Sequence, residues 1–366
     1  MRGLSYSVRS IGSQRARGNS LPARQESRIR FTSRRLPRYP APVQPNPLLP
    51  RGRALLPAVL LILLPALTAA PAATLAERLG YQATDKILIV NGDDTGMCHA
   101  ANVATIEALE KGLMRSATIM VPCPWFLEIA AYAKSHPDKD FGIHLCHTSE
   151  WSKYRWGPVA PRDQVPGLID PEGYLWKDIF DVYAHASPTQ ALIEARAQVR
   201  RALSAGIDVT HLDSHMGTLQ LNPDYVKVYL QLAVEFDLPV RMASQETLAK
   251  MGHPGLRDEF AARGILFTDY FVYEELPKEK DNVRNFWLGV VANLKPGITE
   301  LYIHAGIAGD ELKAVTGSWK TRSEEFEVFT HDEEMKRLVD NNHVKLAGYR
   351  AIRDLQRGER GTPKAR

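Results

Sequence analysis

Short apolar runs alternate with longer segments of helical character along most of this chain. Residues 87–90 (ILIV) contain no polar side chain, which is typical of a strand buried on both faces of a sheet. We predict further strands at residues 117–121, 141–145, 208–213, 238–241, 264–267 and 300–304, and helices at 103–111, 125–135, 188–206, 223–236 and 332–341. Alternating strands and helices imply a parallel sheet. The pattern therefore predicts an α/β fold, a (β/α) barrel-like architecture with a distorted seven-stranded parallel barrel.

Charge is distributed unevenly between the start of the chain and the remainder. Residues 1–53 contain twelve Arg, no Lys and one acidic residue, Glu26, whereas the following 313 residues contain 34 basic and 41 acidic side chains. We predict that residues 1–53 form a disordered basic leader, whose length would also follow from a start codon assigned too early. Because the main part of the chain is acidic, a nucleic-acid partner is disfavoured.

Residues 54–73 have the pattern of a secretory signal peptide. Arg51 and Arg53 precede an apolar run at residues 55–67, and small residues follow it. The run is short for a membrane span, so we expect export to the periplasm or the exterior, with an uncleaved membrane anchor as the alternative. Residues 74–366 contain no linker and are predicted to form one domain. Its three cysteines, Cys98, Cys123 and Cys146, are too few for a disulfide framework and are expected to be small buried side chains.

Asp and His side chains follow several of the predicted strands. Residues 91–94 (NGDD) follow the first strand, His144 lies in the third, residues 211–215 (HLDSH) end the fourth and His304 ends the seventh. In (β/α) barrels the carboxyl ends of the strands carry the chemistry. The sequence therefore predicts that these side chains meet in one site.

The residue types at these strand ends suit a hydrolytic metal centre. Two His and one carboxylate with an open position, here Asp94, His144 and His215, are a common ligand set for such a centre. His211 remains an alternative to His215, because positions 211, 213 and 215 share one side of a strand. Asp213 is then placed to orient a ligand His.

The remaining polar residues complete a hypothesis of amide or ester hydrolysis by attack of a metal-bound water. Asp93 is the expected base and His304 the expected acid. Arg241, after the fifth predicted strand, would hold Asp93 or a substrate oxygen, or form a structural ion pair. Trp151, Tyr154 and Trp156 either stack on a sugar ring or pack the long loop at residues 150–186. Glu324 and Glu325 are predicted to lie on a solvated face.

Residues 91–96 (NGDDTG), 142–145 (GIHL) and 210–215 (THLDSH) resemble motifs of the YdjC-like carbohydrate deacetylases, which include chitooligosaccharide and hopanoid-biosynthesis deacetylases. The resemblance extends over roughly residues 85–350. It implies a (β/α) barrel-like fold, removal of acetyl groups from N-acetylated sugars, and one divalent metal ion, Mg²⁺, with Zn²⁺ also suiting the ligand types. It further implies Asp94, His144 and His215 as ligands, Asp93 as base and His304 as the late histidine.

The chain also departs from this family pattern. Thr95 stands where the family often has an aromatic residue, and Met216 to Thr218 follow His215 where another His is common. The alternatives are a metal-dependent hydrolase of another ester or a phosphoester, and an inactive carbohydrate-binding barrel. An acetylated sugar or oligosaccharide is the expected partner; no stable protein partner is implied, and a homodimer is compatible with the sequence.

Overall fold

The structure is a computed structural model that describes residues 73–272 and 283–359. The described residues all belong to one compact unit. The predicted leader and all but the last residue of the predicted signal peptide lie outside the described residues. Within the described ranges, no helix has both the length and the apolar character needed to cross a membrane.

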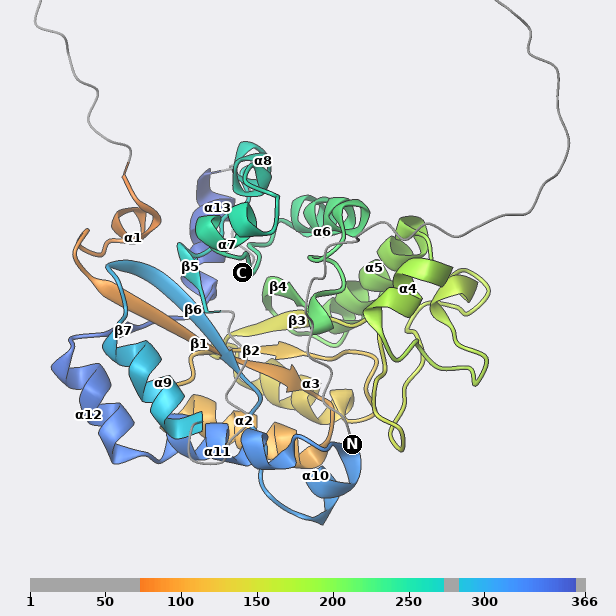
Figure 1. Cartoon of the computed structure of the whole chain (residues 1–366), viewed down its shortest axis with the longest axis horizontal. Coiled ribbons are helices and arrows are strands. Elements are labelled where there is room, and N and C mark those ends of the chain that lie inside the picture. Colours follow the sequence, from red (N-terminus) through yellow and green to blue (C-terminus); the bar gives the residue numbers. More distant parts are fainter. Residues whose placement is uncertain (1–72, 273–282, 360–366) are drawn as a thin grey trace, which may run out of the picture. The chain divides into compact units, whose positions relative to one another are not determined.

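In the described part of the chain, seven parallel strands form one curled sheet flanked by helices (Figure 1). Its order is β4-β3-β2-β1-β6-β5, and β7 pairs with β1. The strands are β1 Lys86–Thr95, β2 Ser116–Ile119, β3 Phe141–Leu145, β4 Val209–Ser214, β5 Tyr270–Phe271, β6 Gly297–Ile303 and β7 Lys345–Leu346. The predicted barrel-like α/β fold is therefore confirmed, with the apolar run at residues 87–90 buried inside the central strand β1.

Backbone hydrogen bonds continue the curl beyond β4. The Leu212 N–H donates to the Pro239 carbonyl at 3.0 Å, and the Arg241 N–H donates to the Leu212 carbonyl at 2.9 Å. The Val240 N–H in turn donates to the Leu266 carbonyl at 3.1 Å. The predicted strand at residues 238–241 is thus reduced to one parallel bridge, between Leu212 and Val240.

The predicted strand at residues 264–267 is wrong. Gly264 has a φ of 72° and its N–H donates to the Ala261 carbonyl, while the Ile265 N–H donates to the Phe260 carbonyl. These two bonds end the preceding helix with a residue in the left-handed conformation. Gly264 and Ile265, the first half of the predicted strand, therefore belong to the end of that helix. The strand begins later, at Tyr270.

Helices cover the sheet on both sides in Figure 1, with α2, α3, α9 and α11 below it and α5, α6 and α8 above it. Ser187 and Asn222 cap α5 and α6: their side chains accept hydrogen bonds from backbone N–H groups at the starts of these helices. The helices are α1 Leu75–Arg78, α2 His99–Lys111, α3 Phe126–Ser135, α4 Ile179–His185, α5 Pro188–Ser204, α6 Pro223–Phe236, α7 Gln245–Lys250, α8 Leu256–Ala262, α9 Val283–Ala292, α10 Asp310–Val315, α11 Trp319–Thr330, α12 Glu333–Asn341 and α13 Arg350–Glu359, with short 3₁₀ turns at Pro166–Leu168 and His215–Gly217.

Gly142 in β3 allows the backbone of β3 to lie against His211 of β4. A Cβ at this position would lie 2.5 Å from the His211 ring and 2.7 Å from the His211 carbonyl oxygen. We expect Gly142→Ala to lower the free energy of unfolding by roughly 1–3 kcal/mol, because a packed core resists added volume. Denaturant titration measures the effect. Gly289→Ala in α9, where a Cβ meets no atom within 4 Å, is the control and should not lower the free energy of unfolding. A Gly142→Ala variant with the same free energy of unfolding as the wild type would contradict the packing argument.

Candidate metal centre

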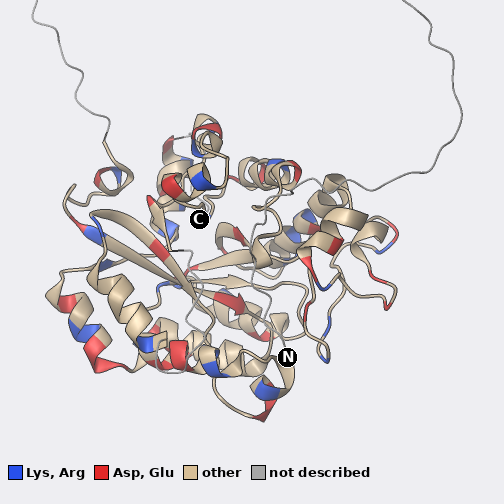
Figure 2. Cartoon of the chain, viewed as in Figure 1, with Lys and Arg blue, Asp and Glu red and all other residues tan. Residues whose placement is uncertain are grey.

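The ends of β1, β3 and β4 bring Asp94, His144 and His215 together. Asp94 Oδ1 lies 3.3 Å from His144 Nε2 and 3.2 Å from His215 Nδ1. The two ring nitrogens lie 3.2 Å apart, and all three side chains are buried. The three atoms therefore form a nearly equilateral triangle, which we call the ligand triangle. Figure 2 shows acidic segments on the central strands, although most charged residues lie on helices and loops.

The ligand triangle fits a divalent cation. Asp94 Oδ1 is buried and, with both rings neutral, has no hydrogen-bond partner, an arrangement that costs free energy unless another group compensates the oxygen. Carboxylate oxygens and imidazole nitrogens bind zinc at about 2.0–2.2 Å, and donor atoms 3.2–3.3 Å apart are compatible with that radius. The unpartnered oxygen and the spacing both indicate a cation site.

A second carboxylate supports each histidine of the triangle. His144 Nδ1 lies 2.7 Å from Asp213 Oδ1, and His215 Nε2 lies 3.0 Å from Glu150 Oε2. When each ring is neutral and donates its one N–H to its carboxylate, the lone pair of the other nitrogen is directed into the triangle. Asp213 therefore lies where the sequence predicts it, whereas Glu150 was not predicted.

Without a cation, the acidic surroundings favour the protonated forms of both histidines. Burial opposes a charged His144, but Asp213 and Asp93 outweigh it and raise the pKa of His144 to about 9. For His215, burial is likewise outweighed, by Glu150 and Asp94, which raise its pKa to about 10. A cation entering the triangle must therefore displace protons.

Asp94 adopts an unusual backbone conformation. Its φ is 62°, in the left-handed region that non-glycine residues rarely occupy, and Gly96 follows with a φ of 92°. The turn is stabilised by the Met97 N–H, which donates to the Asp94 carbonyl, and by the Gly96 N–H, which donates to Asn102 Oδ1. Such strain persists only where the surroundings enforce it, and it is frequent at functional sites.

Arg241 holds Asp93 in a buried ion-pair network. Its guanidinium nitrogens lie 2.7 and 2.8 Å from the two Asp93 carboxylate oxygens, 2.9 Å from Asp213 Oδ2 and 2.8 Å from Glu300 Oε1. Burial would raise the pKa of Asp93, but the Arg241 guanidinium outweighs it and holds that pKa well below its usual range. Asp93 is therefore ionised at neutral pH. Of the interpretations that the sequence left open for Arg241, the contact with Asp93 and a structural ion pair, with Asp213 and Glu300, are both observed.

Donor atoms of Asp93, His144 and Asp213 also lie within 4.8 Å of one another and form a second candidate cluster. Arg241 already balances both carboxylates of this cluster, and His144 Nδ1 is engaged with Asp213. A cation there would displace or repel the guanidinium. The ligand triangle is therefore the better cation site.

Helix α11 contributes two buried side chains that the sequence did not indicate. Arg322 donates to Asp94 Oδ2 at 2.6 Å, which leaves Asp94 Oδ1 as the unpartnered oxygen. Glu325 accepts the His304 backbone N–H at 2.8 Å, so its predicted place on a solvated face is wrong. Which face of α11 is buried depends on how that helix packs. The mixed charges along its sequence did not predict this.

His304 lies beside the triangle at the end of β6. Its Nε2 is 3.8 Å from Asp94 Oδ2, and its side chain is half-buried. Burial lowers the pKa of His304 to about 4, so the ring is neutral at pH 7. The structure thus brings Asp93, Asp94, His144, His215, Asp213, Arg241 and His304 into one region.

His211 lies outside the ligand triangle. Its ring stacks on Tyr349 with 4.0 Å between centroids, and its Nδ1 lies 2.9 Å from Thr210 Oγ1. The structure therefore favours His215 over His211 beside Asp94. The spacing along β4 could not distinguish them, because both side chains follow the same alternation.

The three predicted aromatic residues form a cluster next to His215. Ring centroids of Trp151 and Trp156 lie 5.2 Å apart, and the Trp156 ring lies 6.4 Å from the His215 ring. Trp156 is buried and its indole N–H donates to Cys146 Sγ, while the Tyr154 hydroxyl donates to the Met97 carbonyl. Trp151 is only partly buried. The predicted burial of Cys98, Cys123 and Cys146 is confirmed, and all three are free thiols.

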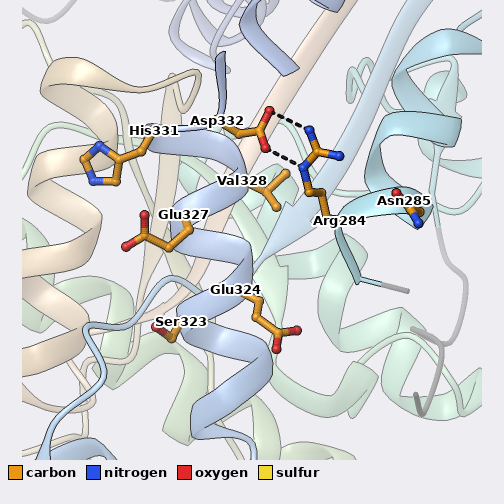
Figure 3. Close-up of a pocket in the computed structure, with 8 residues that line it drawn as sticks. All are labelled: Arg284, Asn285, Ser323, Glu324, Glu327, Val328, His331 and Asp332. Carbon is orange, nitrogen blue, oxygen red and sulfur yellow. Dashed lines mark hydrogen bonds and ion pairs between the residues drawn. The ribbon is translucent and has the colours of Figure 1, made fainter. Parts of the chain in front are cut away.

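A pocket of about 570 Å³ lies elsewhere, between α9 and α11 (Figure 3). Arg284 and Asp332 are ion-paired across it, with a shortest contact of 2.5 Å. None of the residues predicted from the sequence to form the site lines this pocket. Its lining is Arg284, Asn285, Ser323, Glu324, Glu327, Val328, His331 and Asp332.

Comparison with known proteins identifies the family of this chain. A family model described as YdjC-like protein matches residues 87–340. The chain belongs to the YdjC-like protein family. The YdjC-like match begins in β1 and ends in α12, so it contains the ligand triangle, Asp93, Arg241 and, in α11, Arg322 and Glu325.

YdjC-like relatives match this chain over nearly their whole length. A carbohydrate deacetylase of Thermus thermophilus is 30% identical over 288 residues, which are 76% of this chain and 98% of that protein. One from Thermoanaerobacter pseudethanolicus is 27% identical, covering 73% of this chain and 100% of that protein. A crystal structure of a putative cellobiose-phosphate cleavage protein from Enterococcus faecalis superposes with a TM-score of 0.64 at 26% identity, covering 74% of this chain and 99% of that one.

Proposed function

We propose that this protein is a metal-dependent hydrolase that removes acetyl groups from N-acetylated carbohydrates. The observation that carries the proposal is the ligand triangle of Asp94, His144 and His215 beside the ionised Asp93. The names of the YdjC-like relatives support a carbohydrate substrate and a deacetylation reaction. Amide hydrolysis requires an activated water, a polarised carbonyl and a proton for the leaving nitrogen.

Asp94, His144 and His215 would hold one divalent cation. When bound, such a cation polarises the acetyl carbonyl and lowers the pKa of a water. Two imidazoles among the three ligands suit Zn²⁺ better than Mg²⁺, which prefers oxygen ligands. We retain both ions as candidates.

Asp93 would accept the proton of the attacking water. A carboxylate oxygen of Asp93 lies within 4.8 Å of a His144 ring nitrogen, which puts the carboxylate next to this histidine of the triangle. Arg241 keeps Asp93 ionised and orients both of its oxygens. Asn91 adds a hydrogen bond of 2.8 Å to Asp93 Oδ1, so the base is held from two directions.

His304 would deliver a proton to the leaving nitrogen. Glu325 accepts its backbone N–H and fixes the end of β6, which leaves the half-buried ring beside Asp94. Because the ring is neutral at pH 7, its acid role requires a proton gained during the reaction. Trp151, partly buried next to the triangle, would stack on the sugar, and Tyr154 and Trp156 would shape the loop beneath it. The signal-like segment at residues 54–73 supports action outside the cytoplasm.

An assay of acetate released from chitooligosaccharides tests the proposal. We expect activity in the protein as purified, loss after dialysis against a chelator, and recovery when Zn²⁺ or Mg²⁺ is restored. A phosphoester substrate in parallel tests for a different hydrolase. Acetate release that is unchanged after the bound metal has been removed would overturn the metal mechanism, and no release from any N-acetylated sugar would overturn the proposed reaction.

Cation affinity should depend steeply on pH. The raised pKa values of His144 and His215, about 9 and about 10, mean that both rings hold protons at pH 7 in the metal-free protein. Binding then releases up to two protons, so the dissociation constant should fall by up to about 100-fold for each pH unit between pH 6 and 8. Calorimetry in buffers of different ionisation enthalpy measures the protons released. A pH-independent affinity would contradict this charge assignment.

A further inference from the structure

The outer nitrogen of His215 is held by a residue outside the strand-end motifs. Glu150 Oε2 lies 3.0 Å from His215 Nε2, and Glu150 belongs to the loop that follows β3. We infer that Glu150 is a positioning residue that directs His215 Nδ1 toward the cation and strengthens cation binding. The inference rests on one part of the proposed function, namely that the ligand triangle holds a divalent cation.

The chain on both sides of Glu150 is well anchored. The Ser149 backbone N–H donates to the Trp176 carbonyl at 2.7 Å, and the buried Ser149 hydroxyl oxygen accepts the backbone N–H of Trp156 at 3.0 Å. On the other side, the Trp151 ring packs against Trp156. The loop therefore presents the Glu150 carboxylate in a defined place, as a preorganised supporting group requires.

Glu150 differs from Asp213, which supports the other histidine. Asp213 shares its charge with Arg241 at 2.9 Å and also accepts the Thr118 hydroxyl at 2.9 Å. Among the described residues, the side chain of Glu150 has hydrogen-bond and ion-pair contacts with His215 alone. The negative charge of Glu150 is therefore directed at His215 and, through that ring, at the triangle.

A carboxylate in this position has two effects on a ligand histidine. By accepting the Nε2 proton it selects the tautomer whose Nδ1 lone pair binds the metal, and it makes that nitrogen more basic. Loss of such a support commonly weakens metal binding about 10–100-fold. The Trp156 ring next to His215 restricts the orientation of the imidazole but has no charge to replace that of Glu150.

The test is the Zn²⁺ dissociation constant of the full chain, measured by competition with a chromophoric chelator at fixed pH. We expect Glu150→Ala to weaken binding about 10–100-fold and Glu150→Gln, whose amide oxygen still accepts a hydrogen bond, to weaken it less. Glu172→Gln is the control, because Glu172 lies on the same loop with 65% of its side chain exposed, and it should bind like the wild type. The thermal midpoint of each metal-free variant reports any purely structural role.

The outcomes separate this inference from the proposed function. Equal Zn²⁺ affinity of wild type and Glu150→Ala would overturn the role of Glu150 and leave the metal site intact. A wild type that binds no Zn²⁺ would overturn the metal site and the inference together. A Glu150→Ala variant that lowers the thermal midpoint of the metal-free protein, without weakening binding in the fraction that remains folded, would make Glu150 a structural residue.

Discussion

Asp94→Asn should remove most of the cation affinity and lower the rate of deacetylation by about 10³-fold or more. Asp94 provides the one anionic donor of the ligand triangle, and a bound cation contributes several kcal/mol of transition-state stabilisation. The change has a second effect. Arg322 donates to Asp94 Oδ2 at 2.6 Å, and beside a neutral amide its charge would repel a cation.

The metal content of the purified variant, measured by atomic spectroscopy after gel filtration, checks this expectation. Asp224→Asn is the control, because Asp224 pairs with Lys227 on the surface with 69% of its side chain exposed, where such pairs contribute little. Circular dichroism shows whether the variant is folded. Stoichiometric metal in a folded Asp94→Asn protein would refute the ligand assignment.

Asp93→Asn should lower kcat by about 10²–10⁴-fold, the usual contribution of a positioned general base, while metal remains bound. The amide cannot accept the proton of the attacking water. Arg241 retains its contacts with Asp213 and Glu300 in this variant, so the ion-pair network is weakened but not abolished. We therefore expect a fall in kcat with a smaller change in KM.

Metal content and unfolding free energy distinguish loss of the base from loss of structure. A variant with normal metal, a modest loss of stability and a large loss of kcat supports Asp93 as the base. Arg241→Lys provides a comparison, because a lysine keeps the charge but loses the paired contacts with both Asp93 oxygens. Full activity in Asp93→Asn would mean that another group accepts the proton.

The strands that carry the ligand triangle were predictable for a local reason. Buried parallel strands are continuous apolar runs, and the Asp and His residues interrupt such runs at their carboxyl ends in β1, β3 and β4. The predicted segment 141–145 coincides with β3, and 208–213 differs from β4 by one residue at each end. Parallel strands place their carboxyl ends on one side, so the pattern also predicted that the polar residues meet.

The predictions were wrong or missing where the sequence near a residue does not determine its structural role. Residues 264–267 have the composition of a strand, but Gly264 and Ile265 terminate α8, a role that depends on the preceding helix. Glu150 and Arg322 are single charged residues outside any motif, 172 positions apart. Their approach to His215 and Asp94 depends on how the loop after β3 and helix α11 pack.

Periodicity and strand-end chemistry were enough to establish a parallel α/β barrel-like fold and a group of Asp and His residues at one end of it. They could not choose His215 over His211, assign Arg241 to Asp93, or reveal the carboxylate behind His215. Those contacts join residues tens to hundreds of positions apart within about 3 Å. Local propensity carries no information on such distances, and only the packing of loops and helices around the sheet determines them.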